Sequence, residues 1–140
     1  MKSDTIRENT LLVLTLAFLL AGSRPALARH EGAACGVPLP EDPFGHTELI
    51  DIGQRFLVRN VRISPHPQGV MVVGEIHNDR QGFFNFALFK VQLFHGDCTY
   101  LGANNFAIEN FELGVTRPFR VIVPHVQRAT VATYHIEFLP

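Results

Sequence analysis

The side chains with the clearest potential for chemistry stand together in the segment His95-Gly96-Asp97-Cys98. Imidazole, carboxylate and thiolate groups are common ligands of zinc and copper, and a tight turn would bring these three side chains close together. The spacing His-x-x-Cys supplies at most half of such a site. Gly96-Asp97 is also a common turn pair of β-hairpins, because glycine adopts a positive φ at little steric cost. We therefore interpret the segment as a hairpin turn, with a partial metal site as the alternative.

Histidine is frequent in this chain, with 7 residues among 140. Imidazole is a common metal ligand, so a periplasmic copper or zinc site is an alternative function. Such a site would require convergence among four candidates, which are His66, His77, His95 and His125. No two histidines are two residues apart, as on one face of a strand, or four apart, as on a helix. We favour solvated loop histidines; a third role is protonation below about pH 6.5.

The sequence does not indicate a catalytic nucleophile. After residue 28 the single serine is Ser64, and no Gly-x-Ser-x-Gly elbow surrounds it. His66 lies only two residues further on, which does not by itself build a catalytic triad. No glycine-rich phosphate loop is present. We therefore predict that the protein is not an enzyme and has no cofactor.

Aromatic side chains concentrate in the segment "QGFFNFALF", residues 81–89. Side chains alternate along a strand, so we expect Phe84, Phe86 and Leu88 to share one face. Phe83, Ala87 and Phe89 are not expected to share the other face without a slip at Asn85. Two outcomes are open for the remaining rings. They are buried between sheets or under the N-terminal segment, or they form an exposed strip that binds a partner strand or an apolar ligand. The candidate partner-binding residues are Phe83, Phe84, Phe86 and Phe94.

The elements that position these residues follow an N-terminal export signal. Lys2 and Arg7 precede an uncharged apolar run from Leu11 to Gly22, and the small-residue pattern Ala26-Leu27-Ala28 follows it. This is the layout of a secretory signal peptide, and cleavage is predicted after Ala28. A membrane-spanning helix needs roughly 20 apolar residues, and this run has about 12, so an uncleaved signal anchor is the weaker alternative. The predicted location is the periplasm or the cell exterior.

Export bears directly on the two cysteines, Cys35 and Cys98. Both lie after the cleavage site, where an oxidising environment favours a disulfide between an even pair. The bond would tie an N-terminal arm, residues 29–53, onto the domain. It would also remove the thiolate of Cys98 from metal chemistry.

Charge narrows the range of partners. From residue 29 onward the chain has nine Lys and Arg against eleven Asp and Glu, so it is close to neutral. Nucleic-acid binding requires a clustered positive surface, and a membrane surface attracts polybasic segments, so neither partner is predicted. We expect a protein partner in the envelope or outside the cell, with no stable membrane anchor after cleavage.

The pattern of apolar residues predicts the fold. Residues 29–53 are rich in Pro, Gly and acidic residues, which indicates an extended arm. Residues 54–140 alternate between apolar and polar in short runs separated by turns, which predicts an all-β, immunoglobulin-like antiparallel β-sandwich of six or seven strands. The clearest run places Ala87, Phe89, Val91 and Leu93 on one face. In "RFLVRNVRIS" the alternation slips, so a bulge or bend is expected about Asn60.

This strand pattern resembles the FxLYD domain, a small β-sandwich of exported bacterial proteins. The resemblance rests on Val70-Met71-Val72-Val73-Gly74-Glu75-Ile76, Asn78, Val91-Gln92-Leu93-Phe94-His95, Leu101-Gly102, Ile108-Glu109-Asn110-Phe111, Gly114 and Phe119-Arg120-Val121. Within the name motif Leu93 is unchanged, whereas Val91, Phe94 and His95 replace its Phe, Tyr and Asp. The resemblance implies a β-sandwich with a binding or structural role and provides no catalytic residues.

The sequence therefore predicts an exported, non-catalytic β-sandwich that acts as an accessory or protein-binding module of the cell envelope. Two alternatives stay open. One is a periplasmic copper- or zinc-binding protein that uses the histidines. The other is a structural module held permanently within a larger assembly.

Overall fold

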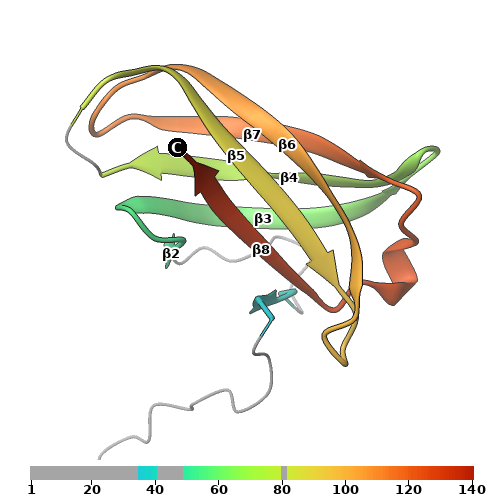
Figure 1. The fold of residues 1–140 in the computed structure, drawn as a ribbon. Helices are drawn as coiled ribbons and strands as arrows, with labels where there is room; N and C mark the ends of the chain where they lie inside the picture. The colour runs from blue at the N-terminus through green and yellow to red at the C-terminus, as the bar shows by residue number, and fades with distance from the viewer. Residues whose placement is uncertain (1–34, 41–48, 80–81) are drawn as a thin grey trace, which may run out of the picture.

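The computed structural model describes residues 35–40, 49–79 and 82–140, and Figure 1 shows that these residues are built mainly from β-strands. The elements are β1 (Val37–Pro38), β2 (Ile50–Asp51), β3 (Phe56–His66), β4 (Gly69–Asn78), β5 (Phe84–Phe94), β6 (Tyr100–Phe111), β7 (Thr116–Pro124), a 3-10 helix η1 (Arg128–Thr130) and β8 (Thr133–Leu139). In these three ranges no helix has the length and apolar character needed to cross a membrane. The predicted signal peptide, residues 1–28, lies outside the described residues.

The strands form two antiparallel four-stranded sheets. Sheet A has the order β1-β8-β5-β6, and sheet B has the order β2-β3-β4-β7. Figure 1 shows the strands of sheet A crossing over those of sheet B. The hairpins β3–β4 and β5–β6 each stay within one sheet, whereas β7 returns to pair with β4 and β8 returns to pair with β5. This Greek-key arrangement of two layers is the predicted immunoglobulin-like sandwich, which is confirmed, with six long strands and two short ones in the described ranges.

The core lies between the two sheets and contains the inward side chains of every long strand. The predicted face of β5 is confirmed, because Ala87, Phe89, Val91 and Leu93 are all fully buried. Phe56 of sheet B lies at the centre of an aromatic cluster, with its ring centroid 5.1 Å from that of Phe89. Full burial of each large apolar side chain contributes about 1.5–3 kcal/mol, so this core is the main source of stability.

Strand β3 contains the expected bulge. The pairing with β4 shifts between Arg59 and Arg62, and Asn60 adopts a left-handed φ of 54°. Because one extra residue is inserted, the side chain of Val61 enters the core and that of Arg62 lies on the outer face. The bulge thereby places two arginines that are three residues apart on the same outer surface of sheet B.

The start of β5 differs from the expectation that Phe84 and Phe86 share a face. Phe84 packs inward, with its ring centroid 5.7 Å from Phe56 and 5.6 Å from Phe138, whereas Phe86 is exposed. The alternation reverses at Asn85, next to Asn110 of β6, which has a φ of 48°. The slip considered at Asn85 is therefore present, and it sends Phe84 into the core.

The N-terminal arm takes part in both sheets. Val37 of β1 pairs with Tyr134 of β8 at the edge of sheet A, and Ile50 of β2 pairs with Val58 of β3 at the edge of sheet B. Both arm residues are partly buried against the core. These short strands add an edge strand to each sheet, so the described part of the arm belongs to the sandwich.

Candidate functional site

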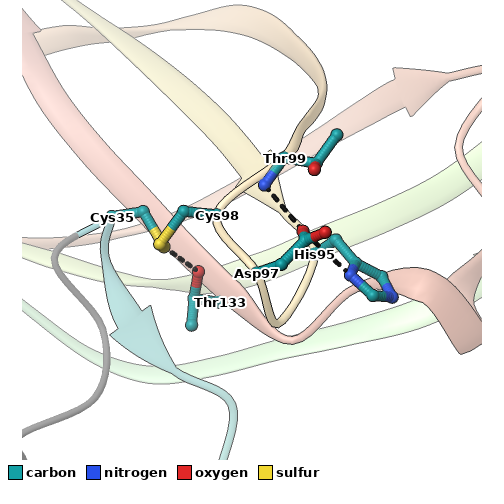
Figure 2. Close-up of a disulfide and its surroundings, with 6 residues drawn as sticks. All are labelled: Cys35, His95, Asp97, Cys98, Thr99 and Thr133. Carbon is teal, nitrogen blue, oxygen red and sulfur yellow. Dashed lines mark hydrogen bonds and ion pairs between the residues drawn. A yellow bond between two sulfur atoms is a disulfide. The ribbon is translucent and has the colours of Figure 1, made fainter.

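The turn between β5 and β6 is organised by its own polar side chains. Asp97 Oδ1 accepts a hydrogen bond from the backbone N–H of Thr99 at 2.9 Å and lies 3.0 Å from His95 Nδ1, as Figure 2 shows. The backbone N–H of Cys98 donates to the carbonyl of His95 at 2.9 Å. The backbone hydrogen bond from Thr99, followed by the Thr99 side chain and His95, lowers the pKa of Asp97 to about 2. His95 and Asp97 therefore hold the turn itself.

The predicted disulfide Cys35–Cys98 is present, with the two Cα atoms 5.5 Å apart. Sγ of Cys35 also lies 3.6 Å from the hydroxyl oxygen of Thr133 at the start of β8. A disulfide sulfur is not a thiolate ligand, so Cys98 does not provide a thiolate to a metal ion in the oxidised protein. The hairpin-turn interpretation of His95-Gly96-Asp97-Cys98 is confirmed.

The four candidate metal-binding histidines do not converge. His66 and His125 line one shallow hollow beside the β3–β4 turn. His77 lies toward the other end of β4, eight residues from Gly69, which pairs with His66; this is about 26 Å at 3.3 Å per residue. Its Nδ1 is 3.0 Å from the Thr116 hydroxyl. His95 belongs to the β5–β6 turn. In the part of the chain that the structure describes, no three His, Cys, Asp or Glu residues form a group that could hold a metal ion.

The four candidate partner-binding phenylalanines also separate. Phe86 and Phe83 are exposed, with 68% and 55% of their surface accessible. Phe84 is part of the aromatic core, as described above. Phe94 lies at the far end of β5, half-buried, with its ring centroid 6.0 Å from that of Tyr100. Of the four, Phe86 is the most exposed, and it lies within a long strand.

Phe86 belongs to a larger apolar surface on sheet A. Leu88, which is 41% exposed, follows it on the same face and pairs with Ala107 of β6 and Leu139 of β8. We call these residues, Phe86, Leu88, Ala107 and Leu139, the outer-face strip. Ala107 and Leu139 were missed at the sequence level, because only the strand register brings them beside Leu88.

Charged residues border the outer-face strip. Glu109 of β6 pairs directly with Phe86 at one end of the strip. At the next position beyond Leu88, Lys90 forms an ion pair with Glu137 of β8, with Nζ 3.3 Å from Oε1. The strip is therefore an apolar area with a polar rim, which is the usual arrangement of a protein-binding surface.

The two packed sheets and the bond Cys35–Cys98 define the protein as a disulfide-containing all-β sandwich. No protein-family model matches the chain. A search of curated protein sequences also gives no match. Among solved structures, the chain is similar to the solution NMR structure of the uncharacterized lipoprotein yajI from Escherichia coli, with 13% sequence identity and a TM-score of 0.49 over 77% of this chain and 70% of that one.

Proposed function

We propose that the protein is an exported, non-catalytic module that binds another protein of the cell envelope, or a secreted protein, through the outer-face strip. Its N-terminal sequence supports export, and so does the disulfide Cys35–Cys98, since such bonds persist in oxidising compartments. The resemblance to the FxLYD domain supports a binding role without catalysis.

The exposure of Phe86 is the observation that carries the proposal. A phenylalanine that leaves 68% of its surface in water contributes little to folding, and here Leu88 and Leu139 extend the same apolar area. Contiguous apolar surface of this kind marks interaction sites on soluble domains. Buried aromatic anchors at interfaces cost at least about 2 kcal/mol when truncated, which is about a 30-fold loss of affinity.

Site-specific photocrosslinking in the native cells tests this function. A photoreactive amino acid replaces Leu88 in one variant and Leu113 in a matched control. Leu113 is a leucine of similar exposure, 54%, in the β6–β7 turn outside the strip. The expected result is one protein crosslinked reproducibly from position 88 and not from position 113.

A second substitution identifies the contact as specific. Phe86→Ser, added to the position-88 variant, is expected to abolish the crosslink while the thermal midpoint of the purified protein is unchanged. Recovery of only uncrosslinked monomer from position 88, or equal crosslinking from positions 88 and 113, would count against the proposed function.

A further inference from the structure

The outer face of sheet B has a pocket at the bulge of β3. Two residues of β3, Asn60 and Val61, stand opposite the single residue Gly74 of β4. The pocket has a volume of about 490 Å³. It is lined by Asn60, Arg62, Val73, Gly74, Glu75, Pro118, Phe119 and Arg120. Bulges recur beside functional sites, where they redirect side chains, and we call this feature the bulge pocket.

Two guanidinium groups flank the pocket from opposite sides. Arg62 of β3 and Arg120 of β7 both pair with Val73 of β4, which lies between them on the outer face. Two strand spacings of about 4.8 Å separate their backbones, so both long side chains can reach one ligand above Val73. Both arginines are exposed. Among the described residues neither has a hydrogen-bond or ion-pair partner.

The carboxylate in the pocket, that of Glu75, already has hydrogen-bond and ion-pair partners. Glu75 Oε2 accepts hydrogen bonds from Arg59 Nε at 2.7 Å and from Asn60 Nδ2 at 2.9 Å. These two hydrogen bonds, that of Arg59 first, lower the pKa of Glu75, so it stays ionised and bound to its own partners. The charges of Arg62 and Arg120 are therefore not compensated within the pocket.

The bulge is what creates this arrangement. Without the extra residue, the alternation that buries Phe56 and Val58 would direct Arg62 toward the core and Val61 toward water. With it, Asn60 bonds Glu75 and Arg62 comes to lie in the same row as Arg120. The left-handed Asn60 and the two arginines on either side of Val73 therefore depend on the same bulge.

We propose that the bulge pocket binds a phosphate group, free or carried by a lipid of the envelope. Each guanidinium offers five N–H donors in a planar fork that matches phosphate oxygens. A phosphate presents several oxygens in different directions, so it can accept hydrogen bonds from Arg62 and Arg120 at once. Val73 and Pro118 line the pocket beside the two arginines, and their apolar surface fits the organic part of a phosphate ester. The site lies on the sheet opposite to the outer-face strip.

The first test is binding of inorganic phosphate to the exported protein, followed by NMR through the amide shifts of Val73 and Gly74. The double variant Arg62→Gln/Arg120→Gln is expected to weaken binding at least tenfold. The charge-matched control is Arg55→Gln/Arg117→Gln, which removes two exposed arginines outside the pocket and is expected to bind as the wild type does. Equal weakening in both double variants would overturn the proposal. So would a wild-type protein that binds neither inorganic phosphate nor phosphatidylglycerol vesicles.

Two further arms identify the source and the geometry. Flotation with phosphatidylglycerol vesicles tests for binding of a lipid phosphate. Phosphatidylcholine vesicles, whose phosphate is balanced by a choline cation, are the reference without net charge. Binding that is stronger to the anionic vesicles and lost in Arg62→Gln/Arg120→Gln assigns the lipid, and binding to inorganic phosphate alone assigns the free ion. Arg62→Lys/Arg120→Lys keeps the charge without the fork, so an intermediate loss is expected. Phe86→Ser should bind phosphate normally, which separates this site from the proposed protein-binding surface.

Discussion

Replacing both cysteines with serine is expected to lower the free energy of unfolding by about 4 kcal/mol. The disulfide joins residues 63 apart in sequence, Cys35 and Cys98. On the chain-entropy model, a loop of this length restricts the unfolded chain by about 14 cal/mol/K, which is about 4 kcal/mol at 25 °C. For a domain of roughly 100 residues, a loss of this size lowers the thermal midpoint by about 15–20 °C.

The remaining contacts of residues 35–40, which contain Cys35, do not replace this contribution. Strand β1 pairs with β8 through two residues, Val37 and Pro38, and the backbone N–H of Leu39 donates to the carbonyl of Ala132 at 3.1 Å. Val37 and Leu39 are only partly buried against the core. Without the disulfide, these few contacts must order residues 35–40 alone, so the amides of this segment should exchange with solvent much faster than those of β5.

Urea unfolding followed by circular dichroism measures the effect. The double variant Cys35→Ser/Cys98→Ser should show a lower midpoint and a larger m-value, because the unbridged unfolded chain exposes more surface. Wild-type protein in reducing agent, and the single variant Cys35→Ser, should lose the same free energy, since each lacks only the cross-link. A loss below about 1 kcal/mol in all three would refute the reasoning.

Four other substitutions test the fold, the turn and the bulge. Phe89→Ala is expected to cost about 3–5 kcal/mol in urea unfolding, and Phe86→Ala less than about 0.5 kcal/mol; similar losses would contradict their opposite orientations. The pKa of Asp97 is about 2 in the folded protein, below its unfolded value near 3.9, so its contribution is present above pH 4 and disappears as the pH falls through 2. Asp97→Asn should therefore lose stability less steeply than the wild type between pH 4 and pH 2, and parallel acid titrations would show that the turn does not depend on this carboxylate. Gly74→Ala would place a Cβ 2.8 Å from the Phe119 ring and should cost about 1–3 kcal/mol, so an unchanged midpoint would argue against the close approach at the bulge.

Local patterns in the sequence were sufficient for the long strands. The alternation from Ala87 to Leu93 has a period of two over a full strand, and it predicted a buried face because one side of each sheet must cover the core. The interruption at Asn60 was equally visible, since no single face holds both Phe56 and Val61 without an extra residue. Both predictions depend only on neighbours within one segment.

Features that depend on strand register were not predictable. Phe84 enters the core because the alternation reverses at Asn85 beside Asn110, and the partner strand is unknown from sequence alone. The short strands of the arm are two residues long, which is too short for a periodic signal. Arg62 and Arg120 come from strands that only the sheet order places around β4. The slip next to Arg62 was the one local sign of their pocket.

The position of the disulfide has a mechanical consequence. Cys98 lies at the end of the sandwich where Phe94 pairs with Thr133. Phe86 is eight residues from Phe94 along β5, which is about 26 Å at 3.3 Å per residue. A pulling force applied to the chain before Cys35 therefore enters the domain through the β5–β6 turn and bypasses the weak pairing of β1. Sheet A would therefore bear the force at one end of β5, while Phe86 lies near the other end.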